Sequence, residues 1–394
     1  MTDGHLSAAD SPGFGIDHLP YGVVRPRGGG EARCVARLGD EAIDLGALDL
    51  SVDPATFSGG TLNRFCAAGP DAWESVREEL QRRIEDDEEL PKFRLSEVEV
   101  LLPLEIGDYV DFYSSLHHAT NLGRLFRPDS EPLMPNWRHL PIGYHGRSGT
   151  VAVSGTPVRR PSGLVKEGES VVHRPSATLD IELEVGFVVG HEIPRGACPL
   201  PDQAAAHVFG VALVNDWSAR DIQAFEYQPL GPFLGKSFLT TMSGWITPMA
   251  ALQPYLVPPP RQDPEPAEHL RAALPWGLDL DLSVELNGTT VSKTNFADLY
   301  WTFAQQLAHM TSNGASARPG DLFASGTVSG DQPGTYGSFI ELTWRGRDPI
   351  ELADGSKRTF LQDGDTVVLR GLAGARGSGE ALELGTAEGT IHPA

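Results

Sequence analysis

A stretch of strict alternation near the middle of the chain most restricts what the chain can fold into. Residues 179–190 read LDIELEVGFVVG, and apolar side chains at every second position predict a β-strand with one buried face. The two faces divide into Leu179, Ile181, Leu183 and Val185 on one side and Asp180, Glu182 and Glu184 on the other. Neighbouring carboxylates repel one another unless water or a cation intervenes, so a solvated sheet edge is one interpretation. Residues 186–190 are apolar on both faces, which favours a strand that runs into a core.

Similar runs extend this β-rich pattern over most of the chain. Strand-like segments occur at 149–154, 209–214, 279–286, 338–344 and 364–370. Helical periodicity occurs mainly at 71–90, 217–227 and 295–312, the last opened by Asn295 and stopped by Gly314. A chain of 394 residues more naturally makes two domains than one, and the pattern changes near Pro103. We therefore expect a mainly β fold with some α, divided into domains 1–104 and 105–394.

Composition excludes several functional classes. With 31 basic and 53 acidic residues the net charge is −22, and such a chain does not neutralise nucleic-acid phosphates. The three cysteines, Cys34, Cys66 and Cys198, form no CxxC pair, so neither a disulfide framework nor a zinc site is indicated. The start MTDGHLSAADSPG resembles no standard export signal, and no apolar run reaches membrane-spanning length. We expect a soluble cytoplasmic protein.

Four polar residues between 214 and 237 recur at helical spacing. Asp216, Arg220, Gln223 and Tyr227 are separated by four, three and four positions, which on a helix places them within an arc of roughly 60°. A binding face and an ordinary solvated face are both consistent with that stripe. The following GPFLGKS has only three residues between its glycines, one fewer than a phosphate-binding P-loop, so no nucleotide site is expected.

Two further segments carry residues suited to acid–base chemistry. Residues 108–129 place His118 among aromatic and small residues, and adjacent histidines without a spaced third favour acid–base work over a transition-metal site. A single histidine is nevertheless more often structural. Glu341 lies in TYGSFIELTW, predicted to share a strand face with Phe339 and Thr343. A carboxylate there needs a partner, and a histidine is the natural one because a carboxylate orients an imidazole and raises its basicity.

Several long segments closely resemble the fumarylacetoacetate hydrolase family. They are DYVDFYSSLHHATN, LMPNWRHLPIGYHGRSGTVAVSGTPVRRP, LDIELEVGFVVG, NDWSARDIQAFEYQPLGPFLGKSF and SGTVSGDQPGTYGSFIEL. The resemblance runs from FGIDHLPYGVV to the final TIHPA. It implies a small N-terminal SH3-like barrel followed by a mixed β-roll catalytic domain that forms a homodimer. It also implies hydrolysis of the C–C bond of 4-fumarylacetoacetate to fumarate and acetoacetate, the last step of tyrosine degradation.

The resemblance also assigns roles to individual residues. Its metal-ligand positions fall on Asp111, Glu182, Glu184 and Asp216, with Lys236 and Thr240 at an additional magnesium-associated position. Its catalytic groups fall on His118, Glu341, Lys236, Arg220 and Gln223. Its substrate-binding positions fall on Tyr113, Arg127, Tyr144, Gln223, Tyr227 and Thr327. A donor set of hard oxygens without cysteine or histidine favours Ca²⁺ or Mg²⁺ over zinc. The chain departs from the family pattern at Leu116, His117 and Leu239.

Two other functions remain open at this point. One keeps the metal site but changes the reaction to acylpyruvate hydrolysis, decarboxylation or isomerisation. The other is a noncatalytic metal- or ligand-binding β-module. The expected partner in the leading interpretation is a small diketo acid, with no nucleic acid and no membrane.

Overall fold

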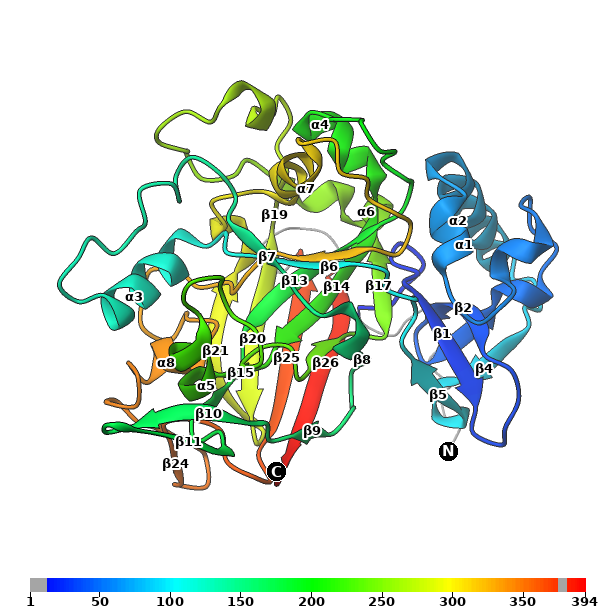
Figure 1. Ribbon diagram of the computed structural model, residues 1–394. Helices are drawn as coiled ribbons and strands as arrows, with labels where there is room; N and C mark the ends of the chain where they lie inside the picture. Colours follow the sequence, from blue (N-terminus) through cyan, green and yellow to red (C-terminus); the bar gives the residue numbers. More distant parts are fainter. Residues whose placement is uncertain (1–12, 375–380) are drawn as a thin grey trace.

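The computed structural model describes residues 13–374 and 381–394, and within them β-strands predominate (Figure 1). The prediction of a mainly β fold with some α is confirmed. A small unit built from the first hundred residues lies on one side of the molecule, and the larger unit carries the second main sheet and the rest of the first.

The N-terminal unit is an antiparallel arrangement of five strands with two helices beside it. The strands pair in the order β5–β1–β2–β3–β4, and their bounds are β1 Tyr21–Pro26, β2 Arg33–Leu38, β3 Glu41–Asp44, β4 Lys92–Arg94 and β5 Val98–Leu101. The helices are α1 Asn63–Ala67 and α2 Pro70–Glu85. Helix α2 confirms the periodicity at 71–90, and its apolar stripe buries Val76 and Leu80.

The N-terminal unit and the larger unit share a sheet and a core. Strand β1 pairs with β17, Trp245–Pro248, so one sheet runs through both units. Tyr21 and Phe65 from the first unit contact Phe209 from the second, with ring centroids 5.6 and 5.4 Å apart. Because this contact is buried and aromatic, it joins the two units firmly.

The large sheet continues through the larger unit, where a second sheet packs against it. Its remaining strands are β6 Tyr109–Phe112, β7 Gly143–His145, β8 Val151–Val153, β13 Leu183–Val189, β14 Val208–Asp216, β16 Thr240–Met242 and β22 Leu322–Ala324. The second sheet has the order β21–β20–β25–β26–β9, with bounds Thr289–Asn295, Leu280–Leu286, Thr366–Ala373, Leu382–His392 and Val158–Arg159. Apolar side chains of both sheets form one buried core.

Short elements complete the architecture. Paired strands are β10 Ser162–Glu167 with β11 Ser170–Pro175, β12 Leu179–Asp180 with β15 Ser218–Ala219, β18 Leu256–Val257 with β19 Gly277–Leu278, and β23 Ile350–Glu351 with β24 Lys357–Arg358. Helices are α3 Leu116–Phe126, α4 Pro201–Ala204, α5 Arg220–Glu226, α6 Met249–Leu252, α7 Phe303–Thr311 and α8 Phe339–Leu342. Single 3₁₀ turns are η2 Leu45–Ala47, η3 Pro54–Phe57, η4 Leu95–Glu97, η5 Ser148–Thr150, η6 Ala205–His207, η7 Gln253–Tyr255, η8 Glu268–Leu270 and η9 Phe296–Asp298.

Most predicted strands are present, but the prediction of a strand at 338–344 is wrong. This segment contains helix α8, in which the Leu342 and Thr343 N–H groups donate to the Ser338 and Phe339 carbonyls. The predicted helix 295–312 begins only at Phe303, because Asn295 ends strand β21 and Thr302 caps α7. The strand predicted within residues 179–190 is interrupted between β12 and β13.

In the part of the chain that the structure describes, no helix combines the length and apolar character needed to cross a membrane.

Candidate functional site

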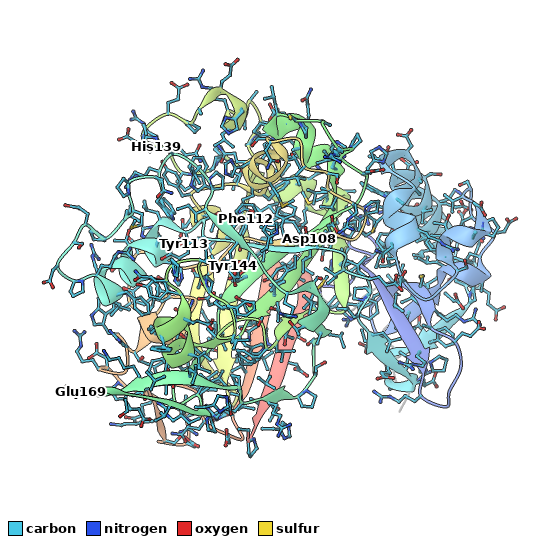
Figure 2. All side chains as sticks on the ribbon, in the orientation of Figure 1. Asp108, Phe112, Tyr113, His139, Tyr144 and Glu169 are labelled. Carbon is cyan, nitrogen blue, oxygen red and sulfur yellow. The ribbon has the colours of Figure 1, made fainter. Side chains whose placement is uncertain are left out.

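One cavity of about 600 Å³ in the larger unit gathers most of the residues that the sequence predicts for the site. Eleven of them line it, namely Asp111, Tyr113, His118, Arg127, Tyr144, Glu182, Arg220, Gln223, Tyr227, Lys236 and Thr327. Two of these are labelled in Figure 2, namely Tyr113, which directly follows β6, and Tyr144, which lies on β7. The remaining four are Glu184, Asp216, Thr240 and Glu341, and each takes part in the buried polar network described below.

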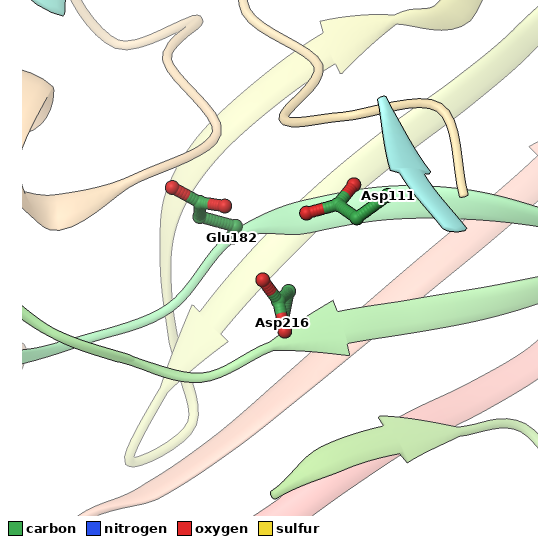
Figure 3. Close-up of side chains that lie close together, drawn as sticks. All are labelled: Asp111, Glu182 and Asp216. Carbon is green, nitrogen blue, oxygen red and sulfur yellow. The ribbon is translucent and has the colours of Figure 1, made fainter. Parts of the chain in front are cut away.

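Three buried carboxylates converge beside the cavity, and two of them line it. Asp111 lies on β6, Glu182 directly precedes β13, and Asp216 ends β14. Each offers an oxygen within 4.8 Å of the others, and their side chains point into a common space (Figure 3). The strands place them there, because β13 pairs with β14 and the Asp216 N–H donates to the Glu182 carbonyl at 3.2 Å.

A fourth carboxylate, Glu184, extends this cluster. Two oxygens of the cluster, one from Glu184 and one from Asp111, have no hydrogen-bond partner among the described residues. These two oxygens are Oε1 of Glu184 and Oδ1 of Asp111, and both are buried, whereas Oε2 of Glu184 accepts from the Gly326 N–H at 3.2 Å. Burial and the neighbouring carboxylates raise the pKa values of Asp111 and Glu184 well above their usual range. Buried oxygens of this kind fit a divalent cation, which would supply the missing partner.

Lys236 supplies positive charge to the same cluster. Its Nζ donates to a carboxylate oxygen of Glu182 and, at 2.7 Å, to Oδ2 of Asp216. Asp216 also accepts from the Tyr144 hydroxyl and from Thr240 Oγ1, each at 3.0 Å. Although burial lowers the pKa of Lys236, Asp216 and Glu182 raise it above the ordinary value. The ammonium therefore stays charged and acts here as a donor rather than as a ligand with a free electron pair.

Arg220 is held between two carboxylates at the start of α5. Its Nε donates to Oδ2 of Asp180 and its Nη1 contacts Oε1 of Glu182, both at 2.8 Å. Its Nη2 is buried without a partner among the described residues, so one donor remains for a ligand in the cavity. The interpretation of Asp216–Tyr227 as one helical face is corrected: Asp216 ends strand β14, and helix α5 begins at Arg220.

The alternatives of a solvated sheet edge and a solvated helix face are also wrong. Asp180, Glu182 and Glu184 are buried, and so are Asp216 and Arg220. Buried charges persist only where they are paired or bind ions. Ion pairs with Arg220 and Lys236 join Asp180, Glu182 and Asp216 into one buried network.

His118 and Glu341 form a buried pair at the cavity wall. Ser115 caps helix α3 by accepting from the His118 N–H, which places the imidazole in the first turn of the helix. The ring Nδ1 donates to Oε2 of Glu341 at 2.7 Å. Glu341 also accepts from Asn121, Ser329 and Ser338 at 3.0, 2.9 and 2.7 Å. Although burial raises the pKa of Glu341, His118, Ser338 and Asn121 lower it below the usual value.

This pairing determines which imidazole nitrogen is free. A carboxylate oxygen accepts from Nδ1, so a neutral His118 carries its proton there and presents a lone pair at Nε2. Nε2 lies 4.0 Å from Oε1 of Glu182, at the carboxylate cluster. A basic nitrogen thus lies directly beside the candidate cation site.

The rest of the cavity lining combines polar donors with an apolar wall. Arg127 donates from Nη2 to the Pro132 carbonyl at 2.9 Å, while its Nε and the Thr327 Oγ1 are buried without a partner among the described residues. The apolar wall consists of Leu122, Phe126, Met134, Ile142 and Leu230. A ligand with a carboxylate at one end and a carbon skeleton matches such a lining.

Four network residues were absent from the predicted set. They are Asp180, Asn121, Ser329 and Ser338. Asp180 belongs to the alternating run, and the serines lie in the segments SGTVSGD and TYGSFIEL, where Ser338 precedes Glu341 by only three residues. The contacts of Asp180 with Arg220 and of Asn121 with Glu341 join residues 40 and 220 positions apart, so no local spacing indicates them.

Family profiles and full-length relatives match this chain. The family profile for the fumarylacetoacetase N-terminal region matches residues 17–105, and that for the fumarylacetoacetate hydrolase C-terminal region matches 109–392. Fumarylacetoacetase from Homo sapiens is 45% identical, covering 99% of this chain and 98% of that protein. The enzyme of the same name from Arabidopsis thaliana is 42% identical, covering 96% of each.

Solved structures share the fold at low sequence identity. A fumarylacetoacetate hydrolase from Exiguobacterium antarcticum aligns with a TM-score of 0.58 and 14% identity, over 95% of this chain and all of that one. A maleylpyruvate hydrolase from Sphingobium aligns with a TM-score of 0.56 and 16% identity over the same shares. These likenesses establish the architecture alone.

Proposed function

The chain belongs to the fumarylacetoacetate hydrolase family and is a hydrolase, and from this premise we propose that it cleaves 4-fumarylacetoacetate to fumarate and acetoacetate. The observation that carries the proposal is the convergence of the His118–Glu341 pair, a carboxylate cluster and unpaired cationic donors on one cavity. The near full-length relatives named fumarylacetoacetase support the same substrate.

The reaction itself states what the site must provide. Water adds to the carbonyl carbon of the fumaryl group, and the bond from that carbon to the acetoacetyl methylene then breaks. The electron pair of that bond leaves as an enolate, which must be stabilised and finally protonated on carbon. The site therefore needs a base, positive charge near two oxygens, and an acid.

His118 is proposed as the base and then as the acid. With Nδ1 bound to Glu341, Nε2 accepts a proton from water and later delivers it to the departing carbon. Glu341 fixes the ring orientation and stabilises the imidazolium that forms between the two steps. One residue thus serves both proton transfers.

Arg220, Gln223 and Lys236 are proposed to stabilise the developing negative charge. All three line the cavity beside Glu182. The free Nη2 of Arg220 and the Lys236 ammonium are charged donors in a buried setting, where such contacts are stronger than in water. Their effect is greatest when the tetrahedral oxyanion and the enolate form.

Tyr113, Arg127, Tyr144, Tyr227 and Thr327 are proposed to hold the substrate. The guanidinium of Arg127 is suited to a substrate carboxylate, because it can present parallel N–H donors. Tyr113 and the apolar wall would then fix the carbon skeleton. The positive charge of Arg127 would thus attract an acidic ligand locally, although the protein as a whole carries a net negative charge.

Asp111, Glu182, Glu184 and Asp216 are proposed to bind Ca²⁺ or Mg²⁺, with Lys236 and Thr240 at an associated position. An all-oxygen donor set favours these cations. When bound, the ion supplies positive charge that polarises the diketone oxygens. The buried unsatisfied oxygens of Asp111 and Glu184 support the assignment.

A related reaction on the same site is the main alternative. Acylpyruvate hydrolysis, decarboxylation or isomerisation would use a similar metal site, and a noncatalytic binding module would use no base. The two matched regions and the identity to full-length fumarylacetoacetases favour the leading reaction. The paired His118 and Glu341 weigh against a noncatalytic module.

We also propose a cytoplasmic homodimer that serves the last step of tyrosine degradation. The described cysteines are free, which fits a reducing compartment. Sedimentation of the purified protein tests the dimer, since a monomeric mass would contradict it.

The proposed function is tested with the metal-loaded and the chelated protein. Loss of fumarylacetoacetate absorbance is followed, with acylpyruvates as competing substrates. We expect turnover that disappears on chelation and returns with Mg²⁺ or Ca²⁺. Preferential turnover of acylpyruvates, or no turnover of any diketo acid, contradicts the proposal.

A further inference from the structure

Asp180 is a fully buried carboxylate that joins two parts of the site without lining the cavity. It ends the short strand β12, which pairs with β15 immediately before Arg220. Its exposed fraction is 0%. Fumarylacetoacetate hydrolysis as proposed above assigns it no role, because the residue faces protein groups on all sides.

Four hydrogen bonds fill the acceptor positions of this carboxylate. Oδ2 accepts from Arg220 Nε at 2.8 Å and from the Ile340 N–H at 3.0 Å. Oδ1 accepts from the Phe339 N–H and from its neighbour Ile181 N–H, both at 2.7 Å. The two oxygens thus each serve two donors, which is close to the maximum for a carboxylate.

One set of these bonds fixes Arg220. With Nε held by Asp180 and Nη1 held by Glu182, the guanidinium plane has little rotational freedom. Its third nitrogen, Nη2, is left without a partner among the described residues. Nη1 also donates to Oε1 of Gln223 at 3.1 Å. A ligand in the cavity therefore meets a donor whose orientation Asp180 helps to fix from the Nε side.

The other set fixes the start of helix α8. Phe339 and Ile340 are its first two residues, and their N–H groups would otherwise lack intrahelical partners. Glu341 follows directly and contacts His118. The same carboxylate therefore sets both the position of Arg220 and the position of the residue that orients His118.

We propose that Asp180 is a positioning residue for the reaction, which aligns Arg220 and the His118–Glu341 pair with each other across the cavity. A purely stabilising role explains the contacts less well. Buried ion pairs often contribute little net stability compared with apolar packing. Residues that hold the ligands of a metal site typically change metal affinity or activity about 10- to 100-fold when altered, and Arg220, which Asp180 holds, contacts the candidate ligand Glu182.

The test compares Asp180→Asn with Asp365→Asn. Asp365 is an equally buried carboxylate outside the cavity lining, and it too is bonded to an arginine and to a backbone N–H, those of Arg358 and Gln362. The amide in Asp180→Asn presents N–H groups to donors, so it cannot satisfy all four contacts. We expect kcat/KM for fumarylacetoacetate to fall about 10- to 100-fold in Asp180→Asn and to stay within about twofold in Asp365→Asn, with comparable losses in thermal stability.

A double-mutant cycle separates positioning from general destabilisation. In an Arg220→Gln background, Asp180→Asn should reduce kcat/KM by a factor at least threefold smaller than in the wild type, because one of its two targets is already gone. An equal factor in both backgrounds overturns the proposal. So does wild-type activity in Asp180→Asn.

Two further measurements test the proposal without relying on the identity of the substrate or on a single variant. Crystal structures should show the Arg220 guanidinium or the start of α8 displaced in Asp180→Asn, even if the wild type does not hydrolyse fumarylacetoacetate; unchanged positions overturn the proposal. Asp180→Ser is assayed in parallel. If both variants are insoluble while Asp365→Asn is soluble, Asp180 is needed for folding and the positioning role is rejected.

Discussion

Oε2 of Glu341 accepts a hydrogen bond at 2.7 Å from Nδ1 of His118, a residue 223 positions earlier in the chain. Both side chains are buried, and three further donors hold the glutamate in place. Because the pKa of Glu341 is lowered despite its burial, the carboxylate is ionised at neutral pH. It therefore leaves Nε2 as the basic atom of the imidazole.

Replacing His118 with Asn should remove most of the activity while leaving the fold intact. General acid–base catalysis contributes about 10²- to 10⁴-fold, so we expect a fall of that size in kcat. Steady-state loss of substrate absorbance measures this fall. The affinity for Mg²⁺ or Ca²⁺, measured by calorimetric titration, should remain close to that of the wild type.

His117→Asn is the matched control, since the neighbouring imidazole does not belong to the residues that line the described cavity. Loss of activity in His117→Asn alone would reverse the assignment.

Local sequence pattern predicted the elements whose burial is regular. Strand β13, for example, is buried along its whole length, and the apolar run from Val185 onward indicates that burial directly. Strand β20 shows the alternation expected of a sheet with one covered face. In both segments the pattern reflects neighbours on a continuous sheet.

Segment 338–344 shows where the pattern stops being informative. Its alternating Phe339, Glu341 and Thr343 suit a strand, yet the carboxylate of Asp180 binds the first N–H groups and a helix forms. That contact joins residues 159 positions apart, so no local window contains it. Tertiary contacts overrode local preference here.

Much of the candidate site could be predicted, but its connections could not. The family resemblance supplied the positions, and the structure brings eleven of them to one cavity. The spacing of Asp216, Arg220 and the following polar residues predicted that these side chains lie near one another, and they do. The predicted cause was wrong, because they do not share one helix: Asp216 ends strand β14 and Arg220 begins helix α5. The residues that hold these groups, such as Asn121, depend on long-range hydrogen bonds.

A divalent cation should stabilise the protein through its carboxylate cluster. A ligand present at 100 times its Kd raises the free energy of unfolding by about 2.7 kcal/mol. We expect Mg²⁺ or Ca²⁺ to raise the unfolding midpoint of the chelated protein, and Asp111→Asn to abolish most of this rise. Asp202→Asn serves as control, because that carboxylate binds backbone N–H groups away from the cluster. An equal rise in Asp111→Asn would place the cation elsewhere.

His18 should make the stability of the protein depend on mildly acidic pH. Its Nδ1 donates to the Gly13 carbonyl at 2.7 Å, so Nε2 accepts from the Thr247 hydroxyl at 2.8 Å. Burial lowers the pKa of His18 from 6.5 to about 4. Between those values the unfolded chain binds a proton that the folded chain does not. The contribution of neutral His18 to the free energy of unfolding is therefore fully present above pH 6.5 and is lost as the pH falls towards 4.

The pH effect of His18 can be isolated by substitution. The difference of about 2.5 pKa units corresponds to about 3 kcal/mol between the two ends of this range. We expect urea unfolding to show a shallower acid dependence for His18→Gln than for the wild type, with the stability gap between them shrinking as the pH falls from 7 to 4. Parallel curves for the two proteins would show that His18 is not responsible.

Gly326 should tolerate no side chain, because two constraints act on it together. Its φ is +79°, and a Cβ would lie 2.3 Å from the Phe112 carbonyl oxygen. Left-handed backbone costs a non-glycine residue about 1–2 kcal/mol, and overpacking adds about 1–3 kcal/mol. Gly334→Ala is the matched control, since its φ is +85° but a Cβ there meets no atom of the described residues within 4 Å. Urea unfolding should therefore show a larger loss in the free energy of unfolding for Gly326→Ala than for Gly334→Ala.

Because Gly326 precedes Thr327 and its N–H binds Glu184, kcat/KM should also fall in Gly326→Ala only. Equal stability losses in the two variants would mean that the strands at Phe112 can separate to accept the methyl group.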